Sequence, residues 1–190
     1  MSLPHIILGM LHQKPRSGYD LNKQLETTIH YFWDADISRI YRSLRAMEKK
    51  SWVQHKTVVQ EDHPNKKVYS LTDSGREELR RWLAEPGKAP GTRNPFLAQL
   101  HFSDAIPIES QLHVLKEHLS SLQADLRELE DRAQRQGFAV PLPERALEQG
   151  VSRKVLSLEY GIRRYWFEIE WAESTIAVLE RALATTQSDH

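Results

Sequence analysis

Basic and small polar side chains recur at helical spacing within residues 36–50. On a wheel of 100° per residue, four of them fall within about 60° of one another and form what we call the basic stripe: Ser38, Arg42, Arg45 and Lys49. Arg39 flanks the basic stripe. The guanidinium of arginine offers two parallel N–H donors, which match guanine O6 and N7 or the oxygens of a phosphate. The basic stripe therefore predicts a surface that binds nucleic acid.

The face opposite the basic stripe is apolar, with Ile40, Leu44 and Met47. A helix that buries one face and presents basic groups on the other fits a DNA major groove about 12 Å wide. The same pattern also occurs on the solvated face of an ordinary amphipathic helix, so the pattern alone leaves both interpretations open. Two acidic residues begin the segment, and we interpret Asp34 or Asp36 as the helix N-cap.

The elements around this segment follow a definite order. Apolar spacing predicts helices near residues 3–11, 21–29, 36–50 and 73–84. Two β-rich runs at 52–59 and 67–71, separated by a turn-like segment, predict a two-stranded hairpin before the fourth helix. Ser17 and Thr72 are suitable N-caps for the second and fourth helices. Three helices, a hairpin and a helix make a winged helix-turn-helix.

The hairpin is the predicted wing. Lys66 and Lys67 lie at its base, where they could reach phosphates beside the minor groove, although exposed lysines are common on any protein surface. Glu61 and Asp62 lie in its turn and would be repelled by DNA. We therefore expect that the tip of the wing does not penetrate DNA deeply.

Composition excludes several classes of protein. The chain has 190 residues, of which 39% are hydrophobic and 27% charged, so it can bury a core and is not mainly disordered. It has no cysteine, which excludes disulfides, thiol catalysis and cysteine-ligated metals, and predicts a cytoplasmic location. No run of 18 apolar residues and no basic-then-apolar leader occurs, so we expect neither a membrane span nor a secretory signal.

The predicted fold is mainly α, with an α+β winged helix followed by long antiparallel helices. Two prolines and two glycines lie within the seven residues of 85–91, which predicts a linker. We expect a winged helix-turn-helix domain over 1–86, a linker and short helix over 87–103, and a helical dimerisation domain over 104–190. Residues 1–85 carry 14 basic against 11 acidic side chains, a modest positive excess.

The second half of the chain carries two heptad seams. The first consists of Leu112, Leu115, Leu119, Leu122, Leu126, Leu129 and Ala133. The second includes Val155, Leu158, Ile162, Tyr165, Ile169, Ile176 and Leu179, which we predict to mediate dimerisation. The two helices could instead satisfy each other's seams within one chain. The second helix, however, also carries apolar residues off its seam, and a helix that is apolar on several faces needs cover on several sides. We therefore expect a homodimer.

Aromatic residues gather on this second helix. Helically spaced aromatics are usually core, so the group fits a dimer interface. Alternatively, Tyr160, Trp166 and Trp171 line a pocket for a small planar aromatic effector.

Several segments resemble the PadR family of bacterial transcription regulators, namely Met1–Leu8, Ser17–Leu21, Ile40–Leu44 and Lys67–Gly75. The opening and the run Tyr31–Trp33 are similar to the AphA-type regulators within that family. The resemblance is good over residues 1–86 and loose beyond them. It implies a cytoplasmic homodimer that binds an inverted-repeat operator on double-stranded DNA, with a small aromatic effector in some members.

The resemblance also implies roles for individual residues. Tyr41 and Arg42 belong to its recognition helix, Lys66 and Lys67 to its wing, and Tyr19 lies near the DNA backbone. One position departs from the family, which usually places glycine where this chain has Ser51. If a left-handed backbone is still required there, serine costs on the order of 1 kcal/mol.

Three functions compete. The first is a dimeric, sequence-specific transcription regulator. The second is an enzyme, which we do not expect, because no HExxH, P-loop, GxSxG or dinucleotide fingerprint is present. Glu109, His113 and Glu117 share a helix face that could hold a metal. A solvated polar face of the helix explains these three residues better. The third is a winged helix that binds only proteins. We expect the first function, with no catalytic residue, no cofactor and no metal.

Overall fold

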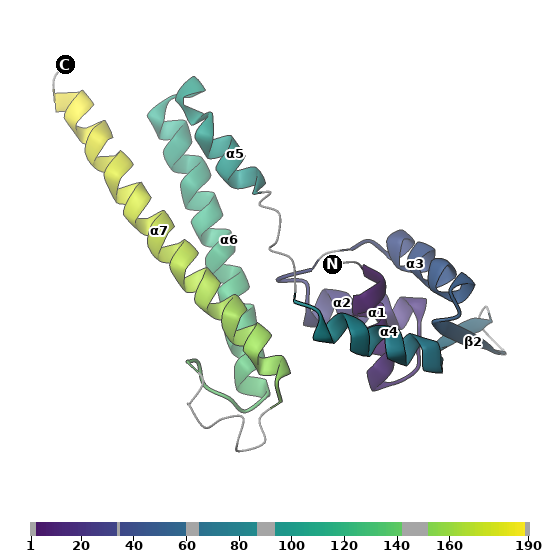
Figure 1. Cartoon of the computed structure of the whole chain (residues 1–190). Helices are drawn as coiled ribbons and strands as arrows, with labels where there is room; N and C mark the ends of the chain where they lie inside the picture. Colours follow the sequence, from purple (N-terminus) through teal and green to yellow (C-terminus); the bar gives the residue numbers. More distant parts are fainter. Residues whose placement is uncertain (1–2, 34, 60–64, 87–93, 142–151, 189–190) are drawn as a thin grey trace. The chain divides into compact units, whose positions relative to one another are not determined.

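The computed structural model describes residues 3–33, 35–59, 65–86, 94–141 and 152–188, and the chain divides into two compact units, Met1–Gly91 and Thr92–His190 (Figure 1). The first unit consists of α1 (Leu3–Gln13), β1 (Arg16–Ser17), α2 (Gly18–Thr28), α3 (Ile37–Lys49), β2 (Val53–Val58), β3 (Lys66–Leu71) and α4 (Asp73–Ala84). The predicted winged helix-turn-helix order is confirmed.

The sheet has one more strand than the sequence predicted. Its order is β1-β3-β2 and every pairing is antiparallel, with Arg16 opposite Tyr69 and Ser17 opposite Val68. Sequence patterning does not reveal β1, because a strand of two residues shows no alternation of apolar and polar side chains. β1 nevertheless matters, because it ties the start of α2 to the wing.

Side-chain caps fix where the helices of the first unit begin. The Ser17 hydroxyl accepts a hydrogen bond from the Asp20 N–H at 3.1 Å, and the Asp20 carboxylate accepts one from the Ser17 N–H at 3.2 Å, which is a capping box. Asp36 caps α3 and Thr72 caps α4. All three predicted caps are confirmed, while the alternative Asp34 lies outside the described residues, as does the predicted wing turn at 61–62.

The core of the first unit gathers the apolar faces of its helices and sheet. Ile40, Leu44 and Met47 are each at most 1% exposed, and they pack with Leu21 and Leu25 of α2 and with α1. Burying such side chains contributes about 1.5–3 kcal/mol each. The predicted inner face of the third helix is therefore the inner face of α3.

The end of α3 is a Schellman motif with serine at the left-handed position. Ser51 has φ 57°, its N–H donates to the Glu48 carbonyl at 2.9 Å, and the Trp52 N–H donates to the Met47 carbonyl at 2.9 Å. The left-handed backbone that the family resemblance implied is thus present, and serine there costs on the order of 1 kcal/mol relative to glycine.

The start of α4 docks directly on this turn. The hydroxyls of Thr72 and Ser74 each donate to the Ser51 carbonyl at 2.5 Å, and the Thr72 N–H donates to the Trp52 carbonyl at 3.2 Å. Gly75 lies so close that an added Cβ would meet the Trp52 carbonyl oxygen at 1.9 Å. Only glycine fits there, so the angle between α3 and α4 depends on that missing side chain.

The second unit is built on a pair of long helices. It contains α5 (Pro95–His101), a 3-10 turn η1 (Ser103–Ala105), α6 (Ile108–Arg135) and α7 (Lys154–Ser188). α6 and α7 run antiparallel and side by side (Figure 1), as shown by the pairing of Lys116 with Glu180 and of Asp125 with Tyr165. α6 ends in a second Schellman motif, with Gly137 at φ 74°.

The two heptad seams pack against each other inside one chain. Leu112, Leu115 and Leu129 of α6 are buried, as are Leu158 and Ile162 of α7. The intrachain alternative therefore accounts for the seams. None of the described helices is long and apolar enough to cross a membrane. Of the linker predicted at 85–91, residues 87–91 lie outside the described residues.

We predict that Gly75→Ala lowers the free energy of unfolding of the first unit by about 2–4 kcal/mol, because its Cβ must displace the Trp52 carbonyl. Urea denaturation followed by circular dichroism measures this. The matched control is Gly9→Ala, whose Cβ meets nothing within 4 Å in the interior of α1 and which should raise stability by about 0.5–1 kcal/mol. Equal effects of the two substitutions would contradict the docking argument.

Candidate nucleic-acid interface

The basic stripe lies on the outer face of α3. Its four residues, together with Arg39, are exposed, and they are opposite the buried Ile40, Leu44 and Met47. Within the described part of the chain, Arg42, Arg45 and Lys49 have no carboxylate at ion-pair distance. Their charges are therefore available to a ligand with several negative groups.

The first residue of the basic stripe is partly engaged in the cap of α3. The Ser38 hydroxyl donates to the Asp36 carboxylate at 2.5 Å, and the Arg39 N–H donates to the same carboxylate at 2.8 Å. The hydrogen bond from Ser38 is the main cause that lowers the pKa of Asp36, and the one from Arg39 adds to it. Asp36 is therefore an anion bound to the start of α3, where the helix dipole favours it.

Two tyrosines join α2 to α3 at this surface. Tyr41 lies across the beginning of α2, where a Cβ on Gly18 would meet its ring carbon Cε1 at 2.4 Å. Tyr19, on the first turn of α2, is 62% exposed. The missing side chain at Gly18 therefore leaves room for the Tyr41 ring, and Tyr41 lies next to the basic stripe on α3.

Lys66 forms an ion pair that joins the wing to α2. Its ammonium lies 2.9 Å from the Asp20 carboxylate. The hydrogen bond from Lys66, followed by the one from Ser17, lowers the pKa of Asp20 to about 2. The stabilisation from this carboxylate is present above its ordinary pKa near 3.8 and is lost as the pH falls towards 2. Both partners are partly exposed, so the pair contributes less than about 1 kcal/mol.

The two lysines of the wing point to opposite faces of the sheet, since adjacent residues of a strand alternate. Lys67 pairs with Thr57, whereas Lys66 pairs with Val58. Lys56 of β2 pairs with Val68 and shares the face of Lys66, and its side chain is exposed. Sequence reasoning missed Lys56, although counting in twos along the predicted strand would have placed it beside Lys66.

Contacts at the base of the wing fix β2 to α3. The His55 ring nitrogen Nδ1 is paired with the Glu48 carboxylate, and the Lys50 ammonium lies 4.4 Å from the centre of the Trp52 ring. The acid at the end of α3 is thus paired with a side chain of the strand that follows, and Lys49 is exposed beside it.

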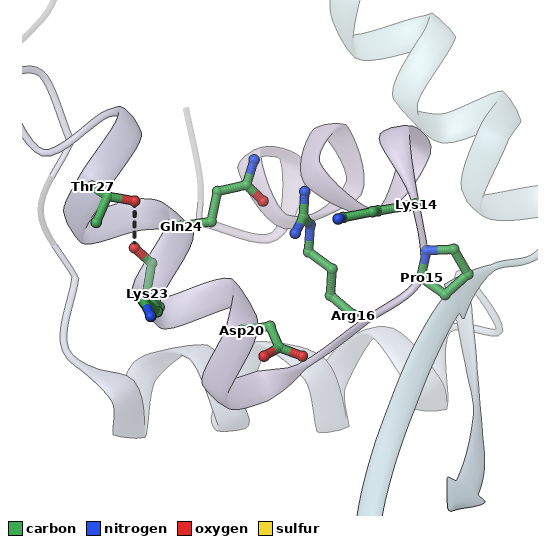
Figure 2. A pocket seen from close by; sticks show the side chains of 7 residues that line it. All are labelled: Lys14, Pro15, Arg16, Asp20, Lys23, Gln24 and Thr27. Atoms are coloured by element: carbon green, nitrogen blue, oxygen red, sulfur yellow. Dashed lines mark hydrogen bonds between the residues drawn. The ribbon is translucent and has the colours of Figure 1, made fainter. Parts of the chain in front are cut away.

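A second group of basic residues, which the sequence analysis missed, lines a pocket of about 530 Å³ between the end of α1 and α2 (Figure 2). Lys14, Arg16 and Lys23 contribute three positive charges, and Asp20 contributes one negative charge. Lys14 lies in a turn, Arg16 in strand β1 and Lys23 in helix α2. No single periodicity in the sequence therefore brings these three residues together.

The seven seam residues predicted for dimerisation lie against α6 in their own chain. Val155, Leu158, Ile162, Tyr165 and Ile176 are buried, and Ile169 and Leu179 are half-buried. The Tyr165 hydroxyl donates to Asp125 at 3.2 Å, and burial raises the pKa of Tyr165. These residues form the core of the helix pair, so a partner subunit would have to contact other faces of α7.

A cavity of about 480 Å³ lies among α5, α6 and α7. Trp171 lines it, together with Phe96, His118 and Phe167. The Phe96 and His118 rings stack with centres 3.6 Å apart, and burial lowers the pKa of His118. Burial in this cavity therefore favours the neutral form of His118.

The other two predicted pocket residues lie elsewhere. Tyr160 is 67% exposed, and the Trp166 indole N–H donates to Glu130 at 3.2 Å. Neither contributes to this cavity. Within the described residues, no three histidine, aspartate or glutamate side chains are arranged to hold a metal ion.

Known proteins resemble this chain over nearly its whole length. The family model described as "Transcriptional regulator PadR-like family" matches residues 7–81, and the model described as "Virulence activator alpha C-term" matches residues 92–180. A probable transcriptional regulator of Mycobacterium tuberculosis is 36% identical, covering 95% of this chain and 98% of the relative.

Two further likenesses concern one protein of Bacillus subtilis. Its negative transcriptional regulator PadR is 28% identical, covering 94% of this chain and 98% of the relative. The crystal structure of Bacillus subtilis PadR in complex with operator DNA has a TM-score of 0.77 and 25% identity to this chain, and covers 93% of this chain and 98% of that one.

Proposed function

This chain belongs to the PadR-like family of transcriptional regulators, and from that membership we propose that it binds an operator sequence in double-stranded DNA as a homodimer. The resemblance to the PadR family predicted from the sequence is confirmed. The chain is a transcriptional regulator and not an enzyme, as its family and relatives indicate. We propose that it acts in the cytoplasm, as expected of a regulator that binds DNA.

The exposed basic stripe on α3 is the observation that carries this proposal. Arg42 and Arg45 are exposed, unpaired among the described residues, and mounted on a helix whose other face is fixed in the core. We assign them to base edges in the major groove, because a guanidinium matches guanine in two parallel hydrogen bonds. The related Bacillus subtilis PadR was solved in complex with operator DNA, which supports DNA binding by this chain.

The remaining residues of the basic stripe and their neighbours are assigned to the DNA backbone. Arg39 and Lys49 extend the positive face along α3, and Lys67 extends it to the wing. Tyr19, Ser38 and Tyr41 supply hydroxyls at the border between α2 and α3. Lys66 forms an ion pair with Asp20, and we assign it a phosphate contact from that position.

The face of α7 opposite its seam is the proposed dimer interface. Four apolar side chains lie within about 40° on a helical wheel and are 44–67% exposed: Leu156, Tyr160, Phe167 and Val178. We call them the outer stripe. Since the seam is filled by α6, a second copy of the chain is the occupant that would cover the outer stripe, and a two-fold axis would then present two α3 helices to DNA. Their half-sites would lie about 34–36 Å apart or a multiple of that, so the operator is palindromic.

The cavity among α5, α6 and α7 is the proposed effector site. Its volume of about 480 Å³ and its lining by Phe96, Phe167 and Trp171 suit one small planar aromatic molecule. Phe167 belongs both to this cavity and to the outer stripe, so a bound molecule would alter the surface on which the two copies meet.

A winged helix that binds only proteins is the alternative function. The basic stripe speaks against it, because three unpaired cations on one helix face favour a polyanion over a mixed protein surface. Absence of any salt-dependent affinity for DNA would favour the alternative.

We predict that Arg42→Ala and Arg45→Ala each weaken binding to the operator by about 1–3 kcal/mol while weakening binding to random DNA much less. Selection of bound sequences from a random pool by the wild-type chain supplies the operator, and fluorescence anisotropy measures both affinities. Arg80→Gln, an exposed charge on α4, is the control and should change neither. Equal losses on both DNAs would show that the two arginines contact only the backbone.

We predict that Tyr160→Glu raises the dissociation constant of the homodimer by at least about tenfold, because it places a carboxylate in an apolar interface. Sedimentation equilibrium measures this. Ser120→Glu adds the same charge to an exposed position of α6 and should leave the constant unchanged. A monomeric wild-type chain at micromolar concentration would contradict the proposed dimer.

We predict that a small planar aromatic compound quenches the fluorescence of Trp171 and lowers operator affinity. The measurement is a titration with neutral, anionic and cationic single-ring aromatics. Trp171→Phe should remove the quenching, whereas Trp166→Phe, outside the cavity, should retain it. Retention of the full signal in Trp171→Phe would place the compound elsewhere.

A further inference from the structure

The pocket between the end of α1 and α2 concentrates positive charge without satisfying it. In Figure 2 the Lys14 ammonium and the Arg16 guanidinium point toward each other, with the Gln24 amide beside them. Within the described residues, Lys14, Arg16 and Lys23 have no carboxylate at ion-pair distance. Two like charges that converge repel each other unless an anion lies between them.

The one acidic residue of the pocket does not neutralise these cations. The Asp20 carboxylate lies apart from the Lys14 and Arg16 groups (Figure 2) and is already bound by Lys66 at 2.9 Å and by Ser17 at 2.8 Å. The negative charge of Asp20 is thus balanced by Lys66, which does not line the pocket. The pocket keeps a surplus of positive charge.

Two buried polar atoms in this pocket have no hydrogen-bond partner. They are the Nε of Arg16 and the Oε1 of Gln24. A buried unsatisfied polar group costs about 1–3 kcal/mol, so a native protein usually supplies a partner. A guanidinium N–H can only donate, so the Arg16 Nε–H requires an acceptor, and an oxyanion supplies several. The Gln24 Oε1 is itself an acceptor, so it requires a donor and is not a ligand for an anion.

We propose that this pocket binds a phosphate group, held by Lys14, Arg16 and Lys23. Arginine and lysine together are the usual ligands of phosphate oxygens, arginine through two parallel bonds and lysine as a point charge. The volume of about 530 Å³ exceeds that of one phosphate and leaves room for what is attached to it. The group is a phosphodiester of DNA or the phosphate of a small molecule.

The DNA backbone is the source that the surroundings favour, and this part of the inference rests on the proposed function. Lys23 follows Tyr19 by one helical turn on α2, so both lie on one face of that helix. A strand of DNA that passes Tyr19 would reach the pocket on the flank of the half-site read by α3. The pocket would then lengthen the bound stretch without adding sequence preference.

Gln24→Glu is the most direct test, because it changes one atom group and places a carboxylate among the cations. This internal anion should take the place of the phosphate. We expect a higher melting temperature in chloride buffer and no further response to phosphate. Gln99→Glu makes the same chemical change on exposed α5 and is the matched control.

The first arm uses inorganic phosphate and the full chain without DNA. At constant ionic strength, replacing chloride by phosphate should raise the melting temperature of the wild type and of Gln99→Glu by at least about 3 °C, and that of Gln24→Glu not at all. An equal rise in all three proteins would mean that phosphate acts on the surface in general and would count against the pocket.

The second arm uses two operator duplexes, one that ends at the half-sites and one extended by ten base pairs on each side. Lys14→Gln and Lys23→Gln should weaken binding to the extended duplex alone, and should lower the slope of log affinity against log salt by about 0.9 for each phosphate lost. Arg80→Gln removes one charge from α4 and should act equally on both duplexes.

The two arms separate the possible results. A response confined to the extended duplex assigns the pocket to the DNA backbone, and a phosphate response with no duplex difference assigns it to a small phosphorylated molecule. No pocket-dependent response in either arm overturns the proposal, while Arg42→Ala still tests the proposed function. If the chain binds no DNA at all, the proposed function fails and the phosphate arm alone decides the pocket.

Discussion

The left-handed turn that ends α3 is the constraint on which the first unit depends. Ser51 adopts φ 57°, and this conformation aims its carbonyl at the hydroxyls of Thr72 and Ser74 while Trp52 turns into β2. Gly75 then approaches the Trp52 carbonyl more closely than any other residue could. One turn therefore sets the direction of α3, the wing and α4 together. Because the apolar face of α3 is fixed by this docking and by the core, its basic face has a single orientation relative to the wing.

Charge is organised locally in a chain whose net charge is zero. Acids near the proposed DNA surface are each bound by a neighbour: Asp36 by the start of α3, Glu48 by His55, and Asp20 by Lys66. Cations of the basic stripe and of the α1–α2 pocket have no such partners among the described residues. The surplus of positive charge therefore lies where a polyanion would pass, and total composition does not reveal it.

In the second unit, opposite faces of α7 have different roles: the seam packs against α6, and the outer stripe is the proposed dimer interface. The seam of α7 is filled by α6 within the chain, so burial of the seam requires no partner subunit. The outer stripe carries Tyr160 and Phe167, both 67% exposed. Large apolar side chains grouped on an exposed surface usually mark a site of interaction. Phe167 also lines the cavity, which joins the surface proposed for dimerisation to the site proposed for an effector.

Local patterns determined much of this protein. The caps Ser17, Asp36 and Thr72, the two faces of α3 and both heptad seams follow from spacing and residue type, because helix periodicity and capping act over a few neighbouring residues. The sequence did not determine which elements pack against one another in the tertiary structure. β1 has two residues and exists only because β3 lies beside it, and the seams gave no sign whether α6 or a second chain would fill them. Lys14, Arg16 and Lys23 meet only after a turn, a strand and a helix have been placed, since long-range packing, unlike periodicity, leaves no repeating mark along the chain.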